Sequence, residues 1–194
     1  MVLYLILTTV YSFFLKRKAI IDVITLAGLY ALRIFAGALA VKVPVSSWLL
    51  AFSLFFFLSL ALMKRFSDLH LLRDNLNDQI AGRGYLATDF GIVQASGIAS
   101  GYLSLLVLAL YINSNHVKTL YSQPQLLWLM IPFLLYWITR MWLLTNRGEM
   151  TDDPIVFTMK DWVSILISLI VLFILLLASV LDKIYHLQSI RMIQ

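Results

Sequence analysis

Long stretches almost free of charge limit what this chain can fold into. A helix needs roughly 20 apolar residues to cross the hydrocarbon of a bilayer, and it satisfies its own backbone hydrogen bonds there. The stretches that reach this length are Ala19–Val41, Val43–Met63, Phe90–Asn115, Thr119–Thr139 and Trp162–Leu181. A shorter apolar segment, Met1–Leu15, precedes them. The sequence therefore predicts an all-α, polytopic transmembrane helix bundle with five full spans and a short one, about six in all.

The composition agrees with a bundle inside a lipid bilayer. Hydrophobic residues make up 61% of the chain and charged residues 13%, against roughly 45–50% and about 25% in soluble domains. So few polar residues would not cover a core in water, so we expect one integral membrane domain over residues 1–194. The net charge of +5 would suggest nucleic acid as a partner of a soluble protein. Here we expect no nucleic acid, because basic residues gather in the cytoplasmic loops of membrane proteins.

The basic residues also orient the spans. Ten of the 15 Lys and Arg residues fall in segments 16–18, 64–89 and 140–160, which alternate along the chain, and four fall on the other side. The positive-inside rule places these three segments in the cytoplasm. Both termini then lie outside, which is the arrangement expected if further spans belong before Met1.

Arg33 stands inside a predicted span, where a charge is costly and usually faces the bundle interior. Asp22 precedes it by eleven residues, about three helical turns, so both fall on one helix face. One interpretation is a polar cavity that opens to the cytoplasm, with this helix in its wall. The other is that Asp22 lies at the membrane interface and Arg33 pairs with another helix.

The segment Lys64–Asp89 is the longest polar stretch. Leu69, Leu72, Leu76 and Ile80 follow helical spacing, which predicts an amphipathic helix on the membrane surface. Its carboxylates are suited to magnesium and its cations to phosphates, although a solvated charged loop explains the pattern as well. Gly82–Tyr85 is either an anion-binding turn or an ordinary one. With the other cytoplasmic segments, this stretch could bind a phosphorylated lipid, its head at the cytoplasmic mouth and its tail between helices.

Several strings resemble a known family. They are Y-S-F-F-L-K-R-K-A-I-I-D-V (Tyr11–Val23), L-Y-A-L-R-I-F-A-G (Leu29–Gly37), S-W-L-L-A-F-S-L-F-F-F-L-S-L-A-L-M-K-R-F-S-D-L (Ser47–Leu69), G-R-G-Y (Gly82–Tyr85) and R-G-E-M-T-D-D-P-I-V-F (Arg147–Phe157). Over nearly its whole length the chain resembles the C-terminal portion of a UbiA-superfamily intramembrane prenyltransferase. Within that superfamily it is most similar to the branch related to decaprenyl-phosphate phosphoribosyltransferase.

The resemblance implies the last six helices of a nine-helix bundle in a bacterial-type inner membrane, with cytoplasmic active-site loops. It implies Mg²⁺, a polyprenyl phosphate or diphosphate substrate and a diphosphate leaving group. The residues carried over as catalytic are Arg33, Lys64 and Asp68, with Asp68 also a metal ligand. Those carried over as substrate-binding are Tyr11, Lys16, Asp22, Arg65, Arg83 and Tyr85.

Two departures from the family pattern qualify these expectations. The family's first aspartate-rich motif, N-D-x-x-D, has no counterpart here. We therefore expect a fragment or a truncated product that needs a chain or domain supplying the N-terminal helices. Phe66 and Asp68 stand where a tyrosine and a glutamate are expected. The sequence leaves two functions open: a transferase acting on a polyprenyl lipid, or a non-catalytic lipid-binding or interaction subunit.

Overall fold

The computed structural model describes residues 2–42, 46–70, 83–115, 117, 121, 123–150 and 153–191. The side chains of 2–3, 5–6 and 181–191 are outside this description. The expected surface helix through Leu72, Leu76 and Ile80 lies outside the described residues, as does Gly82.

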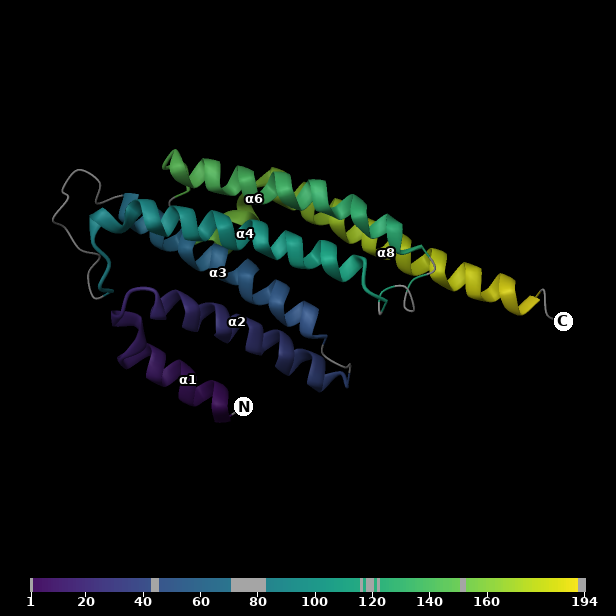
Figure 1. Cartoon of the computed structure of the whole chain (residues 1–194), viewed down its shortest axis with the longest axis horizontal. Coiled ribbons are helices and arrows are strands. Elements are labelled where there is room, and N and C mark those ends of the chain that lie inside the picture. The colour runs from purple at the N-terminus through teal and green to yellow at the C-terminus, as the bar shows by residue number, and fades with distance from the viewer. Residues whose placement is uncertain are drawn as a thin grey trace.

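The described chain is a series of helices. In order they are α1 (Val2–Phe13), η1 (Leu15–Arg17), α2 (Ile21–Ala40), α3 (Ser47–His70), η2 (Ala87–Asp89), α4 (Phe90–Ile112), η3 (Pro124–Leu129), α6 (Met130–Asn146), α7 (Pro154–Lys160) and α8 (Trp162–Arg191). Figure 1 shows α1 at one edge of the molecule, followed by α2, α3 and α4, with α6 and α8 toward the other edge. The longest shared interface joins α3 to α4, and α2 packs on the other side of α3.

The number of spans agrees with the sequence. Five described helical segments are long and apolar enough to cross a membrane, namely Ile21–Ala40, Ser47–His70, Ala87–Ile112, Pro124–Asn146 and Trp162–Val180. With its 12 residues, α1 is about 18 Å long and too short to span. The prediction of an all-α polytopic bundle with five full spans and a short first helix is therefore confirmed.

Two span ends were predicted wrongly. α3 continues to His70 and α6 to Asn146, so Lys64, Arg65 and Arg140 lie on helices and not in loops. Each of these basic residues forms an ion pair, Lys64 and Arg65 with Asp68 and Arg140 with Asp161. Because these charges are paired, the helices continue past them. A prediction from apolar residues alone ends each span before its first cation.

The α3–α4–α6 contact depends on small residues. The Ser59 hydroxyl on α3 donates to the Gly97 carbonyl on α4 (2.8 Å), and the Trp142 indole on α6 donates to Ser59 (3.1 Å). A Cβ atom built on Gly97 would overlap the Trp142 ring. Gly97 therefore sets how closely Trp142 seats against α4.

A second hydrogen-bonded cluster joins α6 to the junction between α7 and α8. Two guanidinium nitrogens of Arg140 donate to Asp161 at 2.6 and 3.0 Å. Asp161 also accepts from the backbone and hydroxyl of Ser164, whose hydroxyl in turn accepts from the Trp137 indole (2.9 Å). Burial raises the pKa of Asp161, but the hydrogen bonds from Arg140 and Ser164 outweigh it and leave the pKa below its ordinary value.

We predict that Gly97→Ala lowers the free energy of unfolding by about 1–3 kcal/mol, because the added methyl group displaces Trp142. The measurement is thermal or denaturant unfolding of the purified chain in detergent. Gly91→Ala on the same helix is the matched control, since nothing lies within 4 Å of a Cβ there. Equal stability of the two variants would contradict this account of the helix contact.

We also predict that the contribution of Asp161 to the stability of the fold is lost at low pH. The pKa of Asp161 is depressed in the folded state, so its stabilising effect is present above the ordinary value of 3.8 and is lost as pH falls below it. The wild-type melting temperature should exceed that of Asp161→Asn at pH 7, and the gap should narrow by pH 3. Glu149→Gln, in an exposed pair, is the control. A gap that is constant with pH would show that Asp161 does not stabilise the fold through its charge.

Candidate functional site

Asp22 is the centre of a polar cluster at one end of the bundle. It lies in the first turn of α2 and is fully buried. Arg65 Nε on α3 donates to its Oδ2 at 2.8 Å, and the Tyr85 hydroxyl donates to its Oδ1 at 2.7 Å. Arg83 Nη1 lies 3.5 Å from Oδ2. Three separate parts of the chain, α2, α3 and the segment before η2, therefore meet on one carboxylate.

Arg65 links this carboxylate to a second one. Its Nη1 donates to Asp68 Oδ2 at 2.7 Å, and Lys64 Nζ lies 3.2 Å from Asp68 Oδ1. Arg65 is only 3% exposed. A guanidinium buried this deeply needs paired charges around it, so Arg65 is held in place by Asp22 and Asp68.

A glycine allows the segment before η2 to reach the cluster. Gly84 has a φ of +67°, and a Cβ atom there would lie 2.7 Å from the Arg17 carbonyl oxygen. Only glycine fits this conformation and this close approach without strain. The turn thereby places Arg83 and Tyr85, on either side of Gly84, against Asp22.

Tyr85 also fastens the start of α2. Its hydroxyl accepts a hydrogen bond from the Ile20 N–H (2.8 Å), and Ile20 has a φ of 67°. That conformation is unfavourable for a β-branched residue and persists only where neighbours enforce it. Burial, followed by the hydrogen bond to Asp22, raises the pKa of Tyr85. The phenol therefore stays protonated and acts as a donor to the carboxylate.

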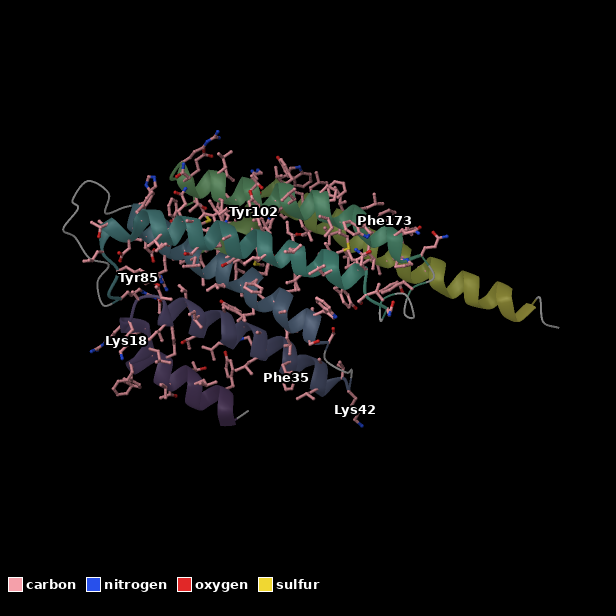
Figure 2. All side chains as sticks on the ribbon, viewed as in Figure 1. Lys18, Phe35, Lys42, Tyr85, Tyr102 and Phe173 are labelled. Carbon is pink, nitrogen blue, oxygen red and sulfur yellow. The ribbon has the colours of Figure 1, made fainter. Side chains whose placement is uncertain are left out.

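A cavity of about 230 Å³ opens beside this cluster. Its lining combines charged and apolar side chains: Tyr11, Leu26, Tyr30, Phe57, Leu60, Ala61, Lys64, Arg65, Arg83, Asp153, Pro154 and Ile155. Figure 2 places Tyr85 at the same end of the bundle as Lys18, with Phe35 and Lys42 toward the other end. The Asp22 cluster and its cavity thus lie at one end of the helix bundle.

A larger apolar groove of about 510 Å³ adjoins the cavity. Phe57, Leu60 and Ile155 line both spaces. The groove runs between α3, α6, α7 and α8, and its other lining residues are mostly aliphatic or aromatic. A charged compartment that continues into an apolar one suits an amphiphile with a charged head and a hydrocarbon tail.

The structure brings together seven of the nine expected site residues. Asp22, Arg65, Asp68, Lys64, Arg83 and Tyr85 form the cluster, and Tyr11 lines its cavity. Lys16 lies in η1 and is not part of the cavity lining. Arg33 is also outside the lining; its guanidinium contacts Tyr4 on α1. Helical spacing put Asp22 and Arg33 on one face, but about 16 Å of helix rise separates them.

The described carboxylates do not form a metal site by themselves. No group of three His, Cys, Asp or Glu side chains in the described part of the chain is placed to hold an ion. Both oxygens of Asp68 are paired with Lys64 and Arg65. Magnesium at Asp68 therefore stays a prediction, one that needs ligands beyond these side chains, such as the phosphates of a substrate.

Asp153 and Tyr30 also line the cavity, but neither is among the predicted site residues. Asp153 caps α7 by accepting a hydrogen bond from the Ile155 N–H (3.0 Å), an ordinary structural role for an aspartate before a helix. Tyr30 stacks on Phe57 with ring centroids 4.9 Å apart, like any aromatic pair in a core. The string Arg147–Phe157 contributes to the family resemblance, but no local pattern in it predicts that Asp153, Pro154 and Ile155 line the cavity.

Comparisons with known proteins give local and partial similarity. The chain is 40% identical over 159 residues to protein y4nM of Sinorhizobium fredii, described as uncharacterized, covering 81% of this chain and 31% of that protein. It is 32% identical over 158 residues to the nodulation protein NoeC of Azorhizobium caulinodans, covering 81% and 52%. It is 37% identical over 71 residues to the decaprenyl-phosphate phosphoribosyltransferase of Mycobacterium tuberculosis, covering 37% and 24%. No family model matches the chain.

The chain spans between about a third and about half of the length of the first two relatives. The similarity to phosphoribosyltransferases extends over about a third of the chain. These findings support a relationship to a transferase over part of a membrane bundle.

We predict that Asp22→Ala destabilises the folded chain by about 3–5 kcal/mol, because it leaves Arg65 buried without its main counter-charge. Unfolding in detergent, followed by circular dichroism, measures the effect. Glu149→Ala, which breaks an exposed pair at 3.9 Å, should change stability by no more than about 0.5 kcal/mol. Similar effects of the two substitutions would mean that Asp22 does not organise the cluster.

Proposed function

We propose that this chain is the lipid-phosphate-binding part of a UbiA-type intramembrane transferase that acts on a polyprenyl phosphate or diphosphate. The observation that carries the proposal is the polar cavity that shares Phe57, Leu60 and Ile155 with a long apolar groove. The local similarity to decaprenyl-phosphate phosphoribosyltransferase supports it, because that name contains both a polyprenyl phosphate and a transfer reaction.

The exposure of the cations separates their roles. The side chains of Lys64 and Arg83 are 29% and 31% exposed, whereas that of Arg65 is 4% exposed. Arg83 Nη1 has no hydrogen-bond partner among the described residues. We assign phosphate binding to Lys64 and Arg83, which can turn toward a ligand. Arg65, Asp22 and Tyr85 hold the rim of the cavity in shape.

The proposed reaction needs charge neutralisation above all. In the phosphoribosyl form, an oxygen of the polyprenyl phosphate forms a bond to the sugar carbon, and the bond from that carbon to the diphosphate breaks. Lys64 and Arg83 would stabilise the negative charge of the phosphate groups in the low-dielectric cavity. Mg²⁺ belongs to the proposal as an ion that accompanies the diphosphate. We further propose that the cavity faces the cytoplasm of a bacterial inner membrane, as the distribution of basic residues favours.

One observation favours a second function. Asp22 and Asp68 are both occupied by cations, which leaves the described residues without a free set of carboxylates for a metal. A chain of this kind would bind the lipid phosphate and rely on a further chain or domain for the first aspartate motif. Alone it would act as a lipid-binding subunit without turnover.

The test is binding of decaprenyl phosphate to the full chain in phosphatidylcholine nanodiscs, measured by native mass spectrometry. Lys64→Gln and Arg83→Gln should each weaken binding by about tenfold or more, as expected for a charge-assisted hydrogen bond. Lys42→Gln, at the opposite end of α2, is the control. Decaprenol, which lacks the phosphate, should bind more weakly and respond to none of the variants.

Turnover is then measured with a radiolabelled phosphoribosyl diphosphate donor. Product formation that is lost in Lys64→Gln supports the transferase. Binding without product supports the lipid-binding subunit. If the wild type does not prefer decaprenyl phosphate to decaprenol, the cavity is not a lipid-phosphate site and both functions fail.

A further inference from the structure

Arg33 has an unusual environment for a charge in a membrane helix. Its guanidinium lies over the rings of Tyr4 and Tyr30, 5.6 and 5.2 Å from their centroids. Nε and one terminal nitrogen donate to the Tyr4 hydroxyl at 2.9 and 2.6 Å. Among the described residues no carboxylate lies within ion-pair distance of it. Two aromatic faces and one hydroxyl orient the cation but do not neutralise it.

The guanidinium is deep in the span. Side chains on a helix lean toward its N-terminus, and the position of Arg33 over Tyr30, three residues earlier, agrees with this. Tyr30 lies near the midpoint of Ile21–Ala40, about 14 Å of helix rise from either end. The charge therefore lies near the middle of the hydrocarbon, beyond the ordinary reach of lipid head groups at its boundary.

Among the residues that the structure describes, no carboxylate lies at that depth. The Asp and Glu residues whose side chains are described are all at or beyond an end of the five spans: Asp22, Asp68, Asp89, Glu149, Asp153 and Asp161. Asp22, on the same helix, is already bound by Arg65 and Tyr85. A second copy of the chain would bring the same distribution and would not supply the missing charge either.

The surface around Arg33 is open and apolar. α2 is the least buried of the five spans, and Arg33 is exposed together with Ala36, Gly37 and Ala40, which lie on the same side of the helix. Figure 1 shows α1 and α2 at the edge of the bundle, and Figure 2 shows Phe35 on this side, away from α4 and α6. This surface is apolar and exposed, and its one cation lies near the middle of the membrane. A matching neighbour would be apolar and carry one negative charge at the same depth.

We propose that the α1–α2 face binds a membrane helix from outside these 194 residues, and that this helix carries an aspartate or glutamate near its midpoint that pairs with Arg33. Polar contacts between membrane helices favour association, and an intramembrane charge is usually paired. This role for Arg33 is separate from the lipid-phosphate site, because Arg33 and Tyr4 do not line the cavity; the two share only Tyr30.

The test uses a synthetic leucine-rich membrane peptide with one central aspartate. Two further peptides carry either a central asparagine or an aspartate near one end. The full chain is reconstituted in phosphatidylcholine vesicles and labelled at Ser12→Cys, an exposed position on α1, which gives one label because the chain has no cysteine. Association is followed by energy transfer to a dye on the peptide.

We expect the central-aspartate peptide to bind about tenfold more tightly than the other two peptides, the size expected of one strong polar contact between membrane helices. Arg33→Leu should abolish this preference, and Arg33→Lys, which keeps the charge, should retain part of it. Arg147→Leu, an exposed cation on α6's C-terminal side, should not change it. Helicity and melting temperature of each variant show that the bundle is folded.

Three results would overturn the proposal. The first is equal binding of the three peptides by wild type. The second is a preference that survives Arg33→Leu. The third is loss of the preference when phosphatidylglycerol is added to the vesicles, since this would show that a lipid phosphate is the counter-charge. Failure here leaves the decaprenyl phosphate experiment unaffected, since the two use different residues.

Discussion

The buried pair of Asp22 and Arg65 is the interaction on which the polar end of this bundle depends. Burying either charge alone would be strongly unfavourable, so each one requires the other and their further partners. Asp22 recruits Tyr85, and Arg65 recruits Asp68, which in turn positions Lys64. The rim of the cavity is thus built from groups whose first role is to satisfy one another. Lys64 and Arg83 are the more exposed cations of this cluster, which is why we propose that they bind the phosphate.

Most of the fold could be predicted from apolar length, because a bilayer permits few alternatives to helices. The ends of α3 and α6 could not, since Arg65 and Arg140 look like loop residues until their partners are known. Those partners, Asp22 and Asp161, are 43 and 21 residues away in the chain. Pairing at such separations leaves no local pattern, and the local pairs of Lys64 and Arg65 with Asp68 are equally compatible with a charged loop. The G-R-G-Y string did indicate a turn, but the close approach of Gly84 to Arg17 is a tertiary property.

Seven of the nine residues that the family resemblance singled out lie together in the structure, whereas Lys16 and Arg33 lie apart from them. Helical spacing gives the angle of a residue around an axis, which is why Asp22 and Arg33 were placed on one face. It does not show which other segment packs against that face at each position along the helix axis. Near its start α2 meets α3 and the Tyr85 turn, whereas at Arg33 it meets α1. Two residues on one face therefore have different partners.

The two charged points on α2 differ in how their charge is compensated. At Asp22 the compensation is complete within the chain, through Arg65, Tyr85 and Arg83. At Arg33 the described residues supply aromatic faces and a hydroxyl but no negative charge. Both points incur the same kind of desolvation cost. The cavity end of the bundle is therefore balanced by its own ion pairs, whereas the cation on the α1–α2 face has no counter-charge among the described residues, and this difference is the reason for proposing a partner helix there.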